Sequence, residues 1–225
     1  MRVAILQPHY LPYSGMFGII DSVDLFIFYD DVQFSPQSWQ QRNKIKTNQG
    51  VKWLSVPVRF HLGDNIKDVL VDGVKWRKKH LETIKQSYSK APKFEEFRHI
   101  LKVYEEQWTH LNNLNQYLIC LLCANLKLNL PKFISSSDLG HEGAKTDRVV
   151  SVLRQVKATE YVSGMAGRNY LEKKKFGDIK LKWFDYHHPE YPQRGSFVPY
   201  LSIIDMLFNA DNPLELIRAG VNIAD

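Results

Sequence analysis

The sequence predicts an α/β fold with a mostly parallel β-sheet and a helical insertion in the middle of the chain. The chain opens with a short apolar strand, a helical pattern and a second apolar strand. Wholly apolar strands that are joined by a helix are typical of parallel sheets covered on both faces. Helical patterns then dominate residues 76–130, and strands alternate with helices again after residue 130.

The first 75 residues supply the strands of one half of this core. Short apolar runs predict the strands, and apolar residues at helical spacing predict a helix between the first two. A polar, basic loop over 35–50 ends at a glycine that marks a turn. Pro57 places the next strand at a sheet edge or a bulge. We expect strands over residues 3–6, 24–31, 51–60 and 69–71, and a helix over 16–23.

The middle of the chain is predicted to be helical. Apolar residues recur at i, i+3 and i+4, so each helix has an apolar face that can pack on the sheet or on another helix. Pro92 separates the first two helices, because the residue before a proline disfavours helical backbone. The three helices are expected over residues 76–88, 94–106 and 111–126.

Strands and helices alternate again in the last part of the chain. A serine-rich loop follows a short strand near residue 134, and Thr146 or Asp147 is placed to cap the next helix. The alternating pattern over 179–186 predicts a further strand. The sequence has no internal repeat or linker, so we expect one domain over residues 1–225. Its α/β core would span about 1–75 and 130–225, and its helical segment about 76–130.

The composition is that of a globular protein with a modest positive charge. Thirty Lys and Arg residues against 24 Asp and Glu residues give a net charge of +6, which either favours anionic ligands or belongs to a solvated surface. No apolar run approaches the roughly 20 residues of a membrane-spanning helix, so no membrane insertion is expected. Cys120 and Cys123 share an apolar helix face, which indicates buried thiols rather than a metal site. We therefore expect a cytoplasmic protein without a bound metal.

The loop after the first strand is the first candidate for a functional site. It reads Q-P-H-Y-L-P-Y-S-G and lies between strand and helix, where open α/β sheets bind ligands. The following helix offers free N–H groups to a phosphate. His9 titrates near neutral pH and is a candidate proton carrier or phosphate ligand; the alternative is a proline-stiffened loop with a surface histidine. The residues selected from this loop are Gln7, Pro8, His9, Tyr10 and Gly15.

The order of strand, proline, histidine, spacer, glycine and helix resembles the opening of the nucleotidylyltransferase superfamily. The His-x-Gly-His motif of that superfamily holds a triphosphate, so the resemblance implies a Rossmann-like sheet and nucleotidyl transfer. The second histidine would fall at Met16 in this chain, so half of the motif is absent.

The segment Y-D-D-V-Q-F-S-P-Q-S-W-Q-Q-R-N-K-I-K is the second candidate. Asp30 and Asp31 end the second strand, where alternation sends one carboxylate toward a site and the other away. The tryptophan and cations that follow suit a nucleotide or RNA, through stacking and phosphate neutralisation. Two carboxylates are too few to predict Mg²⁺, and the alternative is a solvated loop. The selected residues are Asp30, Asp31, Gln33, Trp39, Arg42, Asn43, Lys44 and Lys46.

Two later loops are further candidates. Y-V-S-G-M-A-G-R-N-Y ends a strand in a glycine whose backbone can approach an anion. H-H-P-E-Y-P-Q-R-G carries adjacent histidines whose side chains diverge, so it is expected to line a pocket or anchor the core rather than share a metal. These loops add Ser163, Gly164, Arg168, Tyr170, Tyr191 and Gln193.

Several motifs are spread over nearly the whole chain. They include A-I-L-Q-P-H-Y-L-P-Y-S-G-M-F, D-D-V-Q-F with W-x-x-R-N-K-I-K, Y-V-S-G-x-x-G-x-x-Y-L and L-S-I-I-D-M-L-F-N, in this order. Together they resemble the WbqC-like protein family, with Met16 standing where an aromatic residue is frequent. The resemblance implies a role in bacterial surface-polysaccharide or O-antigen biosynthesis, and it does not supply catalytic residues.

The leading functional hypothesis is a cytoplasmic transferase that moves an acyl or aminoacyl group onto a nucleotide-linked amino sugar, a small anionic substrate. His9 or Asp31 would handle the proton, while the cations and aromatic rings bind the substrate. The sequence demands no cofactor beyond a nucleotide or an acyl or aminoacyl donor; tRNA fits the basic surface without being demanded by it. The alternatives are a nucleotidyl or adenylyl transferase-like enzyme and a non-catalytic protein that binds a nucleotide sugar or RNA.

Overall fold

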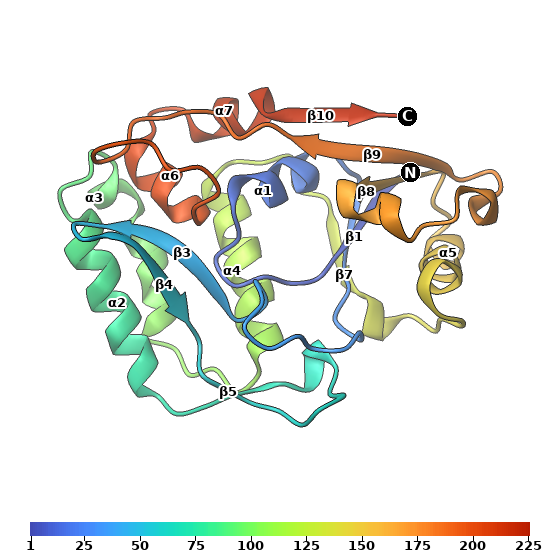
Figure 1. Cartoon of the computed structure of the whole chain (residues 1–225), viewed down its shortest axis with the longest axis horizontal. Helices are drawn as coiled ribbons and strands as arrows, with labels where there is room; N and C mark the ends of the chain where they lie inside the picture. Colours follow the sequence, from blue (N-terminus) through green and yellow to red (C-terminus); the bar gives the residue numbers. More distant parts are fainter.

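The computed structural model describes all 225 residues and confirms the α/β class (Figure 1). The main sheet has six strands in the order β10-β9-β8-β1-β2-β7, and all neighbours are parallel except β9 and β10. Its strands are β1 (Arg2–Leu6), β2 (Leu25–Phe28), β7 (Lys132–Ser135), β8 (Glu160–Gly164), β9 (Lys180–Tyr186) and β10 (Val221–Ala224). The seven α-helices are α1 (Ser14–Asp21), α2 (Lys75–Tyr88), α3 (Phe94–Phe97), α4 (Leu111–Asn125), α5 (Lys145–Gln155), α6 (Ile203–Asn209) and α7 (Pro213–Ala219).

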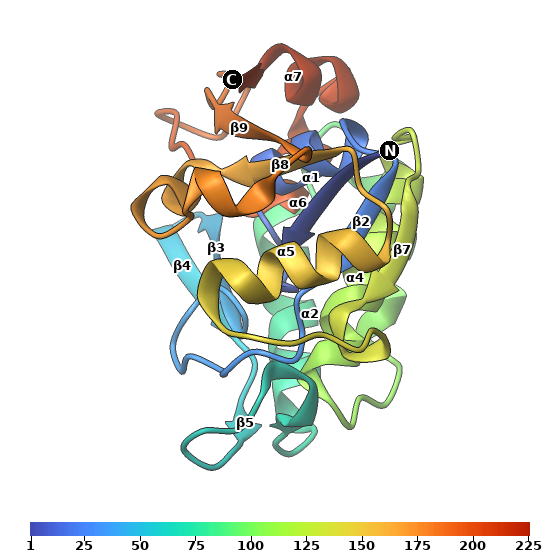
Figure 2. The ribbon, with the colours of Figure 1, turned by 90° about the vertical axis from the view of Figure 1, so that its right-hand side faces the viewer.

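Alternation along the central strands divides the core between the two faces of the sheet. Val3 and Ile5 of β1 pack on one face, whereas Ala4 packs on the other, as the period of two requires. Helix α5 covers the first face, and α1, α4 and α6 cover the second (Figure 2). Because both faces are covered, β2 and the interior of β1 are wholly apolar.

The order in which successive strands join the sheet reverses at β1. From β1 the chain runs through α1 to β2 and on to β7, and from β7 it returns through α5 to β8 on the other side of β1. The carboxyl ends of these parallel strands lie at one edge of the sheet, and the loops after β1 and β8 diverge there. In open α/β sheets a ligand binds at such a switch point.

Two small hairpins lie outside the main sheet. The basic segment that we predicted as a loop contains a strand, because alternation buries Asn43 and Ile45 and leaves the cationic side chains outside. The predicted turn is present, with Gly50 at a φ of 103° that favours glycine. The hairpins pair β3 (Arg42–Thr47) with β4 (Gly50–Ser55), and β5 (Val58–Arg59) with β6 (Leu70–Val71).

Three helices, α2 to α4, lie within residues 75–125. Helix α2 buries every fourth residue from Trp76 to Tyr88, which gives it the apolar stripe of an amphipathic helix. The second helix is shorter than predicted, because α3 has four residues and a 3-10 helix continues it over Arg98–Tyr104. Helix α4 packs into the same core cluster as β2. No helix combines the length and the apolar character needed to cross a bilayer.

Candidate functional site

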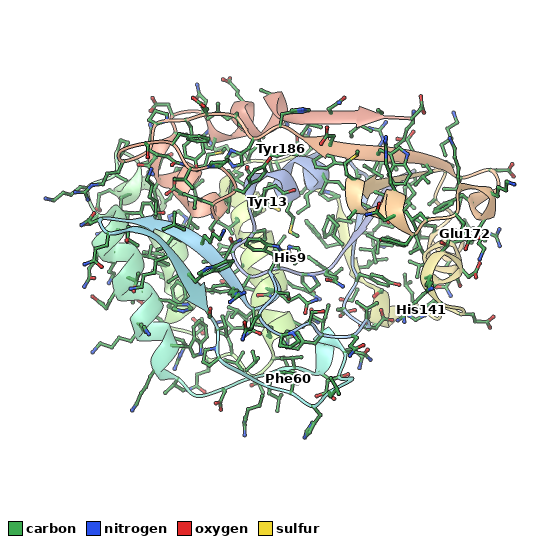
Figure 3. All side chains as sticks on the ribbon, viewed as in Figure 1. His9, Tyr13, Phe60, His141, Glu172 and Tyr186 are labelled. Atoms are coloured by element: carbon green, nitrogen blue, oxygen red, sulfur yellow. The ribbon has the colours of Figure 1, made fainter.

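A pocket of about 250 Å³ lies beside the loop that follows the carboxyl end of β1. Its walls come from this loop, from residues 39–43 and from the segment before α6. Figure 3 labels two of the lining side chains, His9 and Tyr13, near the centre of the view. The lining residues are His9, Tyr13, Trp39, Asn43 and Tyr200.

Buried amide side chains fix the loop after β1. Asn115, which is fully buried on α4, donates from Nδ2 to the carbonyl of Pro8 at 3.1 Å and to that of Gln40 at 2.7 Å. Gln40 in turn donates from Nε2 to Oε1 of Gln7 at 2.9 Å. These bonds join the loop to the segment that begins β3, so the two main walls of the pocket are held in one arrangement.

His9 has no hydrogen-bond partner within the protein on either ring nitrogen. Burial lowers its pKa from 6.5 to about 4, because the charged imidazolium would lose its solvation. At neutral pH the ring is therefore uncharged. It offers a free lone pair that can accept a proton or a hydrogen bond from a bound ligand.

Aromatic rings form the walls of the pocket. Trp39 and Tyr200 are 44% and 53% exposed, so their surfaces are available to a ligand. The ring centroids of Tyr13 and Tyr200 are 6.1 Å apart, and the backbone of Tyr200 has a φ of 58°, which is costly for a bulky residue. Such walls suit a flat nucleobase or the apolar face of a sugar ring.

Gly15 leaves room for the ring of Tyr13. A Cβ atom at Gly15 would lie 2.4 Å from this ring, closer than nonbonded atoms approach. Although alanine favours a helix more than glycine does, we expect Gly15→Ala to displace the ring and lower the free energy of unfolding by about 1 kcal/mol or more. Denaturant unfolding measures the change. Gly164→Ala is the control, because nothing lies within 4 Å of a Cβ atom there; equal losses would contradict the packing argument.

A cationic aromatic surface borders the pocket. The ring centroids of Trp39 and Trp53 are 5.4 Å apart, and both rings are exposed. Arg42 Cζ lies 4.4 Å from the Trp53 centroid, and Lys44 Nζ lies 4.9 Å from it. Neither cation forms an ion pair with a carboxylate, so both charges are available to a phosphate group.

Asp31 is held in a separate network at the end of β2. Its carboxylate accepts a hydrogen bond from Ser136, pairs with His141, and lies 3.0 Å from Arg148 Nη2. Burial opposes ionisation, but the hydrogen bonds and the charge of Arg148 outweigh it and hold the pKa of Asp31 below its ordinary value. Asp31 does not line the pocket of His9, and Figure 3 shows His141 to the right of that pocket.

Asp30 is buried next to this network, with 1% of its surface exposed. It accepts hydrogen bonds from Asn112 Nδ2 at 3.0 Å, from the N–H of Ser137 at 3.1 Å and from the Ser137 hydroxyl at 3.0 Å. The two acids thus tie together the ends of β2 and β7 and the start of α4.

Two predicted substrate-binding tyrosines are in the core. Tyr10 is fully buried, and its hydroxyl lies 2.8 Å from His80 Nδ1 and 2.7 Å from the Tyr104 hydroxyl. Tyr191 is also buried, and its hydroxyl donates to Asp205 at 3.0 Å. Neither ring lines the His9 pocket, because each loop turns its tyrosine inward to satisfy the hydroxyl among buried partners.

The other predicted residues fall in three places. Lys46 and Gln193 are bonded to each other at 3.2 Å and line a second cavity. Gln33 is exposed and forms an isolated bridge with Asn65. At the end of β8, Ser163 is buried and Tyr170 is exposed, while Gly164 ends the strand and Arg168 Cζ lies 5.2 Å from the Trp183 ring centroid.

Several residues of these sites were not selected from the sequence, among them Trp53, Ser136 and the four considered next. Tyr13 and Tyr200 each follow a proline, and this stiffened position was their only local signal. His141 stands in a short glycine-flanked segment, G-H-E-G, and Arg148 lies on the exposed start of a helix pattern. Their partners are far away in the sequence, so no spacing rule could have paired them.

No group of three or more His, Cys, Asp and Glu side chains is placed to hold a metal ion. Cys123 is buried as expected, whereas Cys120 is exposed on the outer side of α4. Burial raises the pKa of the Cys123 thiol.

Comparison with known proteins agrees with the motifs found in the sequence. The model of the WbqC-like protein family matches residues 7–213. The chain belongs to the WbqC-like protein family. The WbqC-like match begins at Gln7 and includes every residue that lines the His9 pocket.

One curated relative spans nearly the same length. "Uncharacterized protein Rv1507c" of Mycobacterium tuberculosis is 40% identical over 218 residues, which are 92% of this WbqC-like chain and 93% of that protein. No solved structure matches the chain.

Proposed function

We propose that this WbqC-like protein transfers an acyl or aminoacyl group to a nucleotide-linked amino sugar in the bacterial cytoplasm, as a step of surface-polysaccharide biosynthesis. The observation that carries the proposal is the uncharged, unbonded imidazole of His9 in a pocket walled by aromatic rings. The pocket lies next to the loop after β1, where the topology favours a ligand.

In the proposed reaction, His9 receives the proton of the attacking amine. The amino nitrogen of the sugar forms a bond to the carbonyl carbon of the donor, and the ester or thioester bond of the donor breaks. The ring nitrogen of His9 takes the proton that the nitrogen loses and passes it to the departing alcohol or thiol. The uncharged imidazole has a free lone pair for this proton, although its pKa of about 4 makes it a weaker base than one whose pKa lies near the working pH.

The surroundings of His9 suit the rest of a nucleotide-linked sugar. Trp39 and Tyr200 present exposed rings for a base or a sugar. Arg42 and Lys44 lie over Trp53 at the border of the pocket and would pair with the diphosphate.

The strand order supports a Rossmann-like character for the sheet. Numbered by their order in the chain, the strands of the main sheet run 3-2-1-4-5-6 from β7 to β10, which is the order of doubly wound nucleotide-binding sheets. The loop after β1 carries Q-P-H-Y-L-P in place of a glycine-rich sequence. In this proposal, cationic side chains therefore replace backbone N–H groups as the main phosphate ligands.

The alternative of nucleotidyl transfer has less support. Met16, which stands where the second histidine of that motif would fall, is 3% exposed and packs in the core. Asp31, the second candidate proton carrier, already accepts from three partners. We therefore assign the proton to His9 and a structural role to Asp31.

A product assay with the full chain tests the proposal. UDP- and dTDP-linked amino sugars are incubated with an acyl thioester or an aminoacyl-tRNA, and mass spectrometry follows the sugar. We expect one donor to add its acyl mass to the amine. If a change in tryptophan fluorescence that Trp39→Phe abolishes reports binding, but no donor transfers its group, the protein is a non-catalytic binder. Pyrophosphate release from a nucleoside triphosphate would favour nucleotidyl transfer.

A further inference from the structure

A second cavity, of about 350 Å³, lies between β3, the end of α2 and the segment before α6. Only two of its twelve lining residues are hydrophobic. Its volume is in the range of small-ligand sites, roughly 300–1,000 Å³. None of its lining residues also lines the His9 pocket, so the cavity is a separate site.

Three cations line this cavity: Lys46, Lys90 and Arg194. None of the three forms an ion pair with a carboxylate. Lys90 follows the carboxyl end of α2, where the helix dipole stabilises a cation. The dipole stabilises the charge of Lys90, whereas Lys46 and Arg194 have only uncharged hydrogen-bond acceptors, namely Gln193 and the Ser196 carbonyl for Lys46 and Asn48 for Arg194.

The single carboxylate of the cavity already accepts two hydrogen bonds within the protein. Asp205 is 1% exposed, and its two oxygens accept hydrogen bonds from Tyr88 at 2.6 Å and from Tyr191 at 3.0 Å. Because both oxygens are engaged by phenols, Asp205 is poorly placed to pair with the cations around it. The cavity therefore presents a net positive charge, with three cationic side chains against one carboxylate.

The wall that carries Lys46 is fixed in place. Lys46 Nζ donates to Gln193 Oε1 at 3.2 Å and to the Ser196 carbonyl. Gln193 in turn bonds the backbone of Val198 through both ends of its amide, at 2.9 and 3.0 Å. The segment that carries Arg194 is thus held near β3, and the Arg194 guanidinium donates a hydrogen bond to Asn48 Oδ1 in the turn after β3.

We infer that this cavity binds the phosphate groups of a small molecule, at a site distinct from the His9 pocket. Three cations around one cavity suit the spread negative charge of a phosphate or diphosphate, whose oxygens accept several charge-assisted hydrogen bonds at once. The inference does not depend on the transfer reaction, because no residue of that reaction lines the cavity.

Calorimetric titration of the full chain with inorganic pyrophosphate tests the inference. We expect the double variant Lys90→Ala/Arg194→Ala to weaken binding by about 100-fold, about 10-fold for each cation removed. Lys46 is left unchanged because it also anchors the neighbouring segment. Thermal unfolding of the variant checks that it is folded.

Matched variants separate the site from a general charge effect. Lys52→Ala/Lys85→Ala removes two exposed cations from β4 and α2 outside the cavity and is expected to change binding less than about 2-fold. His9→Ala is expected to leave pyrophosphate binding unchanged. The inference would be overturned if the native chain does not bind pyrophosphate, or if Lys90→Ala/Arg194→Ala binds it as tightly as the native chain. It would also be overturned if either control variant loses as much pyrophosphate affinity as the cavity variant does.

A parallel titration with ADP identifies the source of the phosphate. Tighter binding of ADP than of pyrophosphate would assign the cavity to a nucleoside diphosphate, and the reverse would assign it to the free anion. Both results support a phosphate site, provided that the variant Lys90→Ala/Arg194→Ala binds each of the two ligands more weakly than the native chain does.

Discussion

His9→Ala is expected to lower kcat for acyl transfer by about 100-fold or more, because general base catalysis contributes about 10²–10⁴-fold. The imidazole has no bonding partner in the protein, so its loss breaks no internal hydrogen bond, and the fold is expected to remain intact. Trp39→Ala provides the contrast, since loss of an exposed stacking ring is expected to raise KM by about 10-fold and leave kcat nearly unchanged. Steady-state kinetics on the substrate pair found in the product assay separates the two effects. A His9→Ala variant with native kcat would remove His9 from the chemistry.

The protonation of His9 can be checked without a substrate. Titration of the imidazole resonances by NMR is expected to give a pKa of about 4 in the folded protein, against 6.5 in the unfolded chain. Between these values the unfolded state binds a proton that the folded state does not, so the free energy of unfolding falls as the pH is lowered from 6.5 to 4. His9→Ala is expected to reduce this pH dependence of the free energy of unfolding without abolishing it. His80 contributes to the part that remains, because it is also buried with a pKa of about 4. A native His9 that titrates near 6.5 would contradict the burial argument.

Asp31→Ala is expected to lower the free energy of unfolding by about 3 kcal/mol at pH 7, since removal of one member of a buried ion pair leaves the other without a partner. His141, Arg148 and the Ser136 hydroxyl would all lose their shared acceptor. Urea unfolding measures the loss. Asp138→Ala is the control, because this nearby carboxylate is exposed and unpaired, and its removal is expected to cost less than about 0.5 kcal/mol.

The stabilisation by Asp31 is expected to depend on pH in a defined direction. Its pKa is lowered from 3.8 in the folded protein, so the stabilisation is present above pH 3.8 and is lost as the pH falls through the folded pKa. The difference between native protein and Asp31→Ala should therefore shrink in acid. Similar stability of the Asp31 and Asp138 variants at pH 7 would contradict the network. A variant that is destabilised but keeps its kcat would confirm a structural role for Asp31.

The location of the pocket could be predicted from the sequence, but its full lining could not. The apolar strand before Gln7 and the helix pattern after Gly15 identified the loop, because a strand followed by a helix fixes where the loop emerges. Tyr200 completes the same pocket from a distant part of the chain. It reaches the pocket because an isolated bridge pairs Tyr13 with Ser202, and no periodic pattern in the sequence encodes that bridge.

The two acids after β2 show the opposite case. Their position at the end of an apolar strand indicated a site, although β2 ends at Phe28 and both acids lie in the loop that follows it, not in the strand predicted over 24–31. The structure surrounds Asp31 with partners from the β7 end and the start of α5, which the sequence could not place beside it. Whether a carboxylate is free or bonded depends on such distant neighbours, so a strand-end acid alone does not identify a catalytic group.

By itself the sequence determined the α/β class, the family, and the loop that bears His9. These depend on local periodicity, on the placement of proline and glycine and on motifs, all of which lie within short stretches of chain. Only the tertiary structure decided that His9 is uncharged and has no hydrogen-bond partner, that Tyr10 is buried, and that the Asp31 carboxylate is already hydrogen-bonded. These properties depend on burial and on hydrogen-bond partners, which contacts between distant segments create.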